Sequence, residues 1–204
     1  MNALTLLAIA METKMAKSLI LFFHPDPSRS RANAALARAA EAVPGTEVVD
    51  MQARFPAGLD MARDGAIEAA RLISAERIVL QFPLHWYAPP PLVQSWQAAV
   101  LTRMMYVLPE TEGACLAGKP LKLAVTTGGA ADAYRNGGRN LFPIPEMLAP
   151  MRATANRCGL VWSRPFVLHD ADNLSAEQLE TAARNYAADL TAWRAESSPL
   201  FAEA

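Results

Sequence analysis

Short apolar runs alternate with segments of helical periodicity along most of the chain. Strands are predicted at 18–23, 46–51, 77–82 and 121–125, with a fifth inside 160–168. Helical spacing of apolar residues covers 32–43, 61–74, a segment beginning at Pro89 and a segment beginning at Ser175. Strands that are apolar on both faces and alternate with helices are typical of a parallel sheet covered on both sides. The pattern therefore predicts an α/β fold with five strands and about five helices.

The predicted helices carry boundary signals and apolar faces. Pro44-Gly45 ends the first helix, Pro89-Pro90-Pro91 suits the first turn of the third, and Ser175 with Gln178 forms a capping box for the last. The predicted buried residues are Ile67, Ala70 and Ile73 in the second helix, Leu92, Trp96, Ala99 and Val100 in the third, and Leu179, Ala183, Tyr186, Leu190 and Trp193 in the last. Irregular stretches are expected at 104–120 and 130–145.

Length and composition favour one globular domain. The chain has 204 residues, of which 52% are hydrophobic and 19% are charged. We expect a single domain over 17–196, a loose N-terminal extension over 1–16 and a tail over 197–204. The apolar segment 1–11 lacks a basic flank and is too short to span a bilayer, so Met11 or Met15 is a candidate natural start and no direct membrane insertion is expected.

Charge and cysteine content exclude further classes of function. A net charge of −1 without any cluster of Lys and Arg argues against nucleic-acid binding. Cys115 and Cys158 lie far apart without metal-ligand spacing, which argues against a disulfide framework or a metal site and favours a reducing cytoplasm.

Three loops follow predicted strands at what would be one edge of the sheet, where open α/β folds bind ligands. The loop over 24–33 offers hydroxyl, guanidinium and helix N-terminal amide groups that suit a phosphate, although an ordinary capped helix would give the same pattern. The loop over 82–91 sets aromatic residues between prolines, as a platform for a flat ring or as a surface aromatic cluster. The loop over 126–134 begins with paired glycines, which let amides approach a ligand or simply make a turn. Together the loops predict a site for a phosphorylated heteroaromatic ligand.

Four segments resemble the NAD(P)H dehydrogenase (quinone) family. They are HPDPSRSRAN at 24–33, QFPLHWYAPPPL at 81–92, AVTTGG at 124–129 and PMRATANRCGLVW at 150–162. The resemblance spans roughly 17–195 and is closest to the ancillary oxidoreductases of glutathione-gated potassium efflux systems. It implies a flavodoxin-like three-layer sandwich with a five-stranded parallel sheet in the order 2-1-3-4-5.

The resemblance also implies a flavin site. The ribityl phosphate would be held by His24, Ser30, Arg31, Ala32 and Asn33. One edge of the isoalloxazine would be lined by Leu84, His85, Trp86 and Tyr87, and its pyrimidine side by Thr126, Thr127, Gly128 and Gly129. FMN is the implied cofactor, with FAD as the alternative because larger relatives use it.

The implied catalytic residues are Tyr134 and Arg139. Tyr134 matches a tyrosine that stabilises negative charge near the N1–C2=O edge of the flavin when hydride arrives. The family often places a histidine five or six residues later, where this chain has Arg139 and Asn140. An arginine can stabilise an anion but hardly deprotonates, so the protonation of the acceptor is not accounted for. His169, after the fifth strand, is expected to be structural or at the surface.

The sequence supports two functions. The first is an enzyme, a homodimer that transfers hydride from NADH or NADPH through the flavin to a quinone. The second is a regulatory cytoplasmic subunit of a potassium efflux antiporter, held at the inner membrane through that partner. A flavodoxin-type electron carrier is disfavoured by the near-neutral charge. The chain also lacks the acidic cluster of a receiver domain, the G-x-G-x-x-G of a Rossmann dehydrogenase and the G-x-S-x-G of a serine hydrolase.

Overall fold

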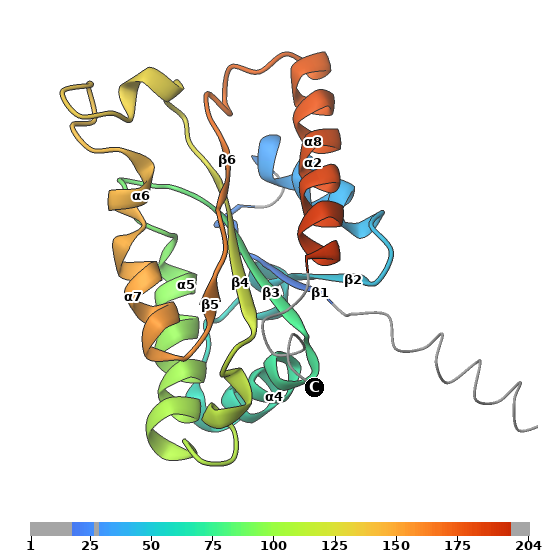
Figure 1. Ribbon diagram of the computed structural model, residues 1–204, viewed down its shortest axis with the longest axis vertical. Helices are drawn as coiled ribbons and strands as arrows, with labels where there is room; N and C mark the ends of the chain where they lie inside the picture. Colours follow the sequence, from blue (N-terminus) through green and yellow to red (C-terminus); the bar gives the residue numbers. More distant parts are fainter. Residues whose placement is uncertain (1–17, 27–28, 197–204) are drawn as a thin grey trace, which may run out of the picture.

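A computed structural model of the chain describes residues 18–26 and 29–196, and the expected N-terminal extension and C-terminal tail lie outside them. The described residues form a parallel sheet with helices on both faces (Figure 1). Its strands are β1 (Ser18–Phe22), β2 (Thr46–Asp50), β3 (Arg77–Pro83), β4 (Pro120–Thr126), β5 (Val161–Trp162) and β6 (Phe166–Leu168). The order β2-β1-β3-β4-β5 confirms the predicted topology.

The fifth position of the sheet is occupied by two short strands instead of one. Both β5 and β6 pair with β4 in parallel, and Ser163, Arg164 and Pro165 separate them. Pro165 has no backbone N–H to donate, so a continuous ladder through it is disfavoured. The prediction of a single fifth strand was therefore wrong in this detail.

Seven α-helices are described among these residues. They are α2 (Ala32–Glu41), α3 (Met51–Arg54), α4 (Met61–Ser74), α5 (Pro91–Trp96), α6 (Ile144–Met147), α7 (Ala149–Arg157) and α8 (Ala176–Ala195). The helix that begins as α5 continues through π-helical turns η2 (Gln97–Leu101) and η3 (Arg103–Val107), and 3-10 turns follow at η4 (Gly113–Leu116) and η5 (Ala131–Ala133). Figure 1 shows α2 and α8 on one side of the sheet and α5 and α7 on the other.

The two faces of the sheet bury separate hydrophobic cores. Ile20, Leu36, Tyr186 and Leu190 pack on the side of α2 and α8. The larger core contains side chains from α4, α5 and α7 together with alternate residues of the central strands. The burial of Tyr186, Leu190 and Trp193 and the capping box of α8 confirm the expected last helix, except that Ala182 rather than Ala183 is its buried alanine.

Three local expectations were wrong. Met51 begins α3 instead of extending β2, because the Asp50 carboxylate accepts hydrogen bonds from the N–H groups of Gln52 and Ala53 and caps a helix. The stretch 104–120, expected to be irregular, contains η3 and η4, and the stretch 130–145 contains η5 and the start of α6.

The buried face of α4 is the third correction. Ile67 and Ala70 are exposed, whereas Glu68, Ala69 and Leu72 are buried. Glu68 can turn inward because its carboxylate accepts a hydrogen bond from Arg54 at 2.8 Å and lies 3.5 Å from the guanidinium of Arg71. Paired burial of a charge thus overrides the apolar pattern.

Candidate functional site

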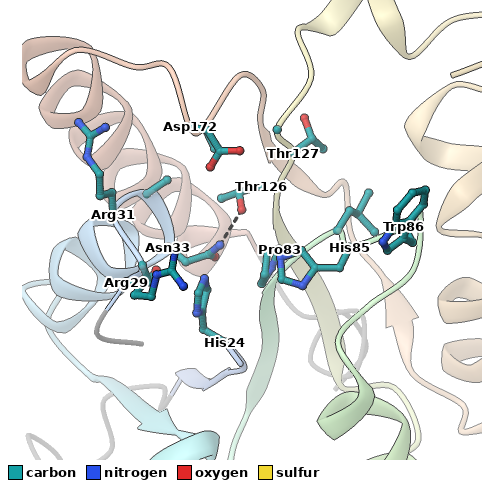
Figure 2. A pocket seen from close by; sticks show the side chains of 15 residues that line it. His24, Arg29, Arg31, Asn33, Pro83, His85, Trp86, Thr126, Thr127 and Asp172 are labelled. Carbon is teal, nitrogen blue, oxygen red and sulfur yellow. Dashed lines mark hydrogen bonds between the residues drawn. The ribbon is translucent and has the colours of Figure 1, made fainter. Parts of the chain in front are cut away.

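The carboxyl ends of β1, β3, β4 and β6 lie at one edge of the sheet, and a cavity of about 440 Å³ opens there (Figure 2). It is lined by His24, Arg29, Ser30, Arg31, Ala32, Asn33, Pro83, Leu84, His85, Trp86, Thr126, Thr127, Gly128, Ala171 and Asp172. The three predicted loops are therefore brought together, and a fourth loop, after β6, joins them.

One end of the cavity suits an anion. The N-terminus of α2 opens there, and the first-turn N–H groups of a helix have no partner within it. The Ser30 hydroxyl accepts a hydrogen bond from the Ala34 N–H at 3.1 Å, which satisfies one amide of the first turn of α2. Arg29 and Arg31 add positive charge, and Arg31 Nη2 donates to the Leu174 carbonyl at 3.1 Å.

His24 presents a neutral ring to the same end. Its Nδ1 accepts a hydrogen bond from the Asp26 N–H at 3.1 Å, and burial lowers the pKa of the imidazole. A neutral ring whose Nδ1 accepts carries its proton on Nε2. His24 is thus a hydrogen-bond donor to whatever occupies this end.

A buried polar network forms the floor of the cavity. Asn33 is only 2% exposed, and its side-chain Nδ2 donates to Thr126 Oγ1 at 2.6 Å. The main-chain carbonyl of Asn33 accepts a hydrogen bond from Gln81 Nε2 at 2.8 Å. Among the described residues, the Thr126 hydroxyl proton meets no acceptor and Asn33 Oδ1 meets no donor. Buried polar atoms rarely stay unpaired, so these atoms favour a ligand above them.

The opposite end is an aromatic turn. Trp86 and Tyr87 adopt φ angles of 49° and 65°, between the reciprocal hydrogen bonds of His85 and Ala88 at 2.9 and 3.1 Å. Positive φ at both central residues is the geometry of a two-residue hairpin turn that usually takes Asn-Gly. The turn leaves the Trp86 side chain 92% exposed, and the N–H groups of Trp86 and Tyr87 bond to no other described residue.

The glycine pair makes a close-fitting cradle beside this turn. The N–H groups of Gly128 and Gly129 donate to no described protein atom. A Cβ at Gly128 would lie 2.9 Å from Asp172 Oδ2, and one at Gly129 would lie 3.2 Å from Tyr134 Cε2 and 3.4 Å from Arg139 Nη2. Only glycine fits without displacing these groups, and the free amides are available to acceptor atoms of a ligand.

Four predicted residues lie beside the cavity lining rather than within it. Gly129 and Arg139 line a neighbouring polar hollow, and Tyr134 packs next to both. The Tyr87 hydroxyl donates to Asn140 Oδ1 at 3.3 Å, which links the aromatic turn to the loop that carries Arg139.

Thr127 uses its hydroxyl within the protein. Its Oγ1 donates to the Gly129 carbonyl at 3.0 Å and lies 3.0 Å from Nδ1 of His169. Both contacts are satisfied when His169 donates from Nδ1. The contact between Thr127 and His169 thus stabilises the conformation of the loop over 127–129.

The comparisons with known proteins bear on this arrangement. A family model described as having a flavodoxin-like fold matches residues 16–190. The chain belongs to this family. The resemblance to the NAD(P)H dehydrogenase (quinone) family that the sequence motifs carry is also confirmed.

Relatives of this flavodoxin-like protein match over nearly their whole length. General stress protein 14 of Bacillus subtilis is 37% identical over 171 residues, covering 84% of this chain and 95% of that protein. The glutathione-regulated potassium-efflux system ancillary protein KefF of Klebsiella pneumoniae is 35% identical over 176 residues, covering 86% and 96%. The crystal structure of general stress protein 14 of Treponema denticola in complex with FMN has a TM-score of 0.77 and 31% identity, covering 86% and 98%.

Four lining residues of the flavodoxin-like site were not among the predicted contacts: Arg29 and Pro83, which lie within two of the predicted loops, and Ala171 and Asp172, which lie outside them. The last two come from the loop after β6, which shares the carboxyl edge with the three predicted loops. The rule that ligands bind at this edge would have found them, had it been applied to the fifth strand as well. Among the described residues, no helix combines the length and apolar character needed to cross a membrane.

Proposed function

We propose that this chain is a flavin-dependent oxidoreductase that passes two electrons, as hydride, from NAD(P)H to a quinone. The observation that carries the proposal is one cavity with a cationic helix N-terminus at one end and an aromatic turn with unpaired amides at the other. This arrangement complements a molecule with a phosphate at one end and a flat polar ring at the other.

The residues present fit a flavin. At the phosphate end stand His24 and the α2 N-terminal run, Ser30, Arg31, Ala32 and Asn33. At the ring end, Leu84, His85, Trp86 and Tyr87 would line one edge, and Thr126, Thr127, Gly128 and Gly129 the pyrimidine side. The free amides of Gly128 and Gly129 suit ring carbonyl and nitrogen acceptors. The FMN complex of the Treponema denticola relative supports FMN over FAD.

When bound, the flavin would supply the hydride acceptor and donor, and the protein would supply orientation and electrostatics. The overall reaction, NAD(P)H plus a quinone plus one proton giving NAD(P)⁺ plus a hydroquinone, draws its proton from water. Tyr134 and Arg139, which flank Gly129, would stabilise negative charge at the pyrimidine edge through a hydroxyl donor and a guanidinium. The Arg139 guanidinium would act as a fixed positive charge.

The first test is the visible spectrum of the purified protein. We expect the absorbance of an oxidised flavin, bleached by NADPH or NADH and restored by a quinone, and release of the cofactor by heat identifies FMN or FAD. A colourless protein that takes up neither flavin on reconstitution would contradict the proposal.

A second function has its own support. KefF of Klebsiella pneumoniae is named as an ancillary protein of a glutathione-regulated potassium-efflux system. By analogy, this chain would bind the cytoplasmic side of an efflux antiporter, and regulation would be its main task. Copurification of the two proteins, together with the absence of quinone reduction, would favour this function over the first.

We further propose a homodimer with the site at the subunit interface. Leu141 and Phe142 are 63% and 54% exposed and lie next to Asn140, which accepts a hydrogen bond from Tyr87 of the aromatic turn. The two loops that this hydrogen bond joins therefore expose four large apolar side chains, Trp86, Tyr87, Leu141 and Phe142, which we call the apolar rim. Exposed apolar side chains gathered on neighbouring loops favour a protein partner.

A further inference from the structure

Asp172 contributes a carboxylate to the lining of the cavity. None of the flavin contacts proposed above involves this carboxylate. It comes from the loop after β6, and its Oδ2 lies so close to Gly128 that a Cβ there would be 2.9 Å away. No described group donates a hydrogen bond to it. The nearby Arg31 guanidinium donates to the Leu174 carbonyl instead. The Asp172 side chain is exposed, so its carboxylate is open to a donor group of a ligand in the cavity.

Thr126 offers the complementary group. It is buried on the cavity floor, its Oγ1 accepts from Asn33 at 2.6 Å, and its own proton meets no described acceptor. Figure 2 shows Asp172 and Thr126 between the end that carries Arg29 and Arg31 and the end that carries His85 and Trp86. A donor and an acceptor thus face the middle of one cavity.

This pairing selects for a particular chemistry. A hydroxyl group both donates and accepts, so it satisfies Thr126 and Asp172 together. A phosphate at this position would only accept and would be repelled by the carboxylate. The middle of the cavity is therefore suited to a polyol.

We propose that Asp172 and Thr126 recognise the hydroxylated chain that joins a flavin ring to its phosphate, and that Asp172 thereby selects flavins with a ribityl chain. This assigns Thr126 to the chain instead of to the pyrimidine side of the ring, where the resemblance to the family set it. The inference rests on the proposed flavin-dependent function. It names a specificity residue outside the three loops from which the flavin site was predicted.

A series of three flavins tests the inference without reference to turnover. Lumiflavin has the ring alone, riboflavin adds the ribityl chain, and FMN adds the phosphate. Dissociation constants would be measured by quenching of flavin fluorescence, with the full chain freed of copurified flavin. In D172A we expect riboflavin and FMN to bind about 10- to 100-fold more weakly, because a hydrogen bond to a charged group is lost, and lumiflavin to bind as in the wild type.

Three other outcomes would overturn the inference. D172A could bind all three flavins as the wild type does, bind FMN more tightly because the carboxylate faces the phosphate, or lose affinity for all three, lumiflavin included. A wild-type chain that binds none of the three would overturn the proposed function and this inference with it.

Two further variants serve as a control and as a conservative substitution. E110A removes an exposed carboxylate that lines neither this cavity nor the neighbouring hollow, and should leave all three constants unchanged. D172N keeps an acceptor oxygen without the charge and should retain riboflavin affinity better than D172A does. If circular dichroism shows that D172A does not fold, D172N and T126V are compared instead. Both variants should bind riboflavin more weakly than the wild type does and bind lumiflavin equally well.

Discussion

His169 has a definite place beside the candidate site. Its Nδ1 lies 3.0 Å from Thr127 Oγ1, and its ring centroid lies 5.4 Å from that of Tyr134. Burial lowers the pKa of His169 below its ordinary value of 6.5, and burial acts in the same direction on His24. The expectation of a structural residue fits these contacts, since His169 braces the loop that presents the glycine pair.

The lowered pKa gives His169 a measurable effect on stability. Below pH 6.5 the unfolded chain takes up a proton at this position while the native ring stays neutral until its own lower pKa is reached. The unfolded state then binds more protons, so the free energy of unfolding falls as the pH drops through this window. We predict that H169N, whose amide can still donate to Thr127, loses less stability than the wild type between about pH 7 and about pH 5.

Urea unfolding of the flavin-free protein at several pH values measures this difference. Because His24 contributes in the same direction, the pH dependence should become shallower in H169N without disappearing. Parallel curves for the two proteins would contradict the assignment.

At the scale of elements, the turn over 84–88 carries strain. Tyr87 has a φ of 65°, a backbone conformation that costs an ordinary residue about 1–2 kcal/mol and costs glycine almost nothing. Non-glycine residues persist in such conformations mainly at functional sites. The turn therefore presents its aromatic side chains and free amides at a cost in stability.

Two substitutions at one position isolate this strain. Y87G and Y87A both remove the ring and its hydrogen bond to Asn140, but only Y87A keeps a Cβ. We predict that Y87G is more stable than Y87A by about 1 kcal/mol in urea unfolding, the reverse of the order found in helices. A Y87A protein as stable as Y87G would show that the turn is relaxed.

The fold and the positions of three loops could be predicted because they depend on local patterns. Alternating strands and helices fix the sheet, and cap signals such as Ser175 with Gln178 fix helix ends. The buried face of α4 could not be predicted, because Glu68 turns inward only where Arg54 and Arg71 meet its carboxylate. Those contacts depend on segments far apart in the chain, which periodicity does not register.

The site was predictable to a similar extent. Asn33 and Thr126 were identified from their loops, but the hydrogen bond between them joins residues far apart in the sequence. Asp172 follows a strand that is divided at Pro165, and its pattern is weaker than those of the central strands. Its place at the cavity follows from the pairing of β6 with β4, which is a property of the assembled sheet.

At the scale of the whole molecule, the apolar rim formed by Trp86, Tyr87, Leu141 and Phe142 bears on assembly. We predict a dimer by light scattering, and a shift toward monomer in F142E, because a charge buried against a second copy lacks a partner. I67E is the matched control, since Ile67 is similarly exposed on α4 outside this rim, and it should leave the mass unchanged. A monomeric wild-type protein would exclude the proposed dimer.

The divided fifth strand has a consequence for the behaviour of the protein at high concentration. A long, flat strand at the border of a sheet offers a continuous row of backbone donors and acceptors to any passing chain, which makes it a template for aggregation. Here that border consists of β5 and β6, two short pieces interrupted at Pro165, so no long row is available on this side. Pro165, which interrupts the backbone hydrogen bonds at this border, therefore also disfavours edge-to-edge association between copies of the protein.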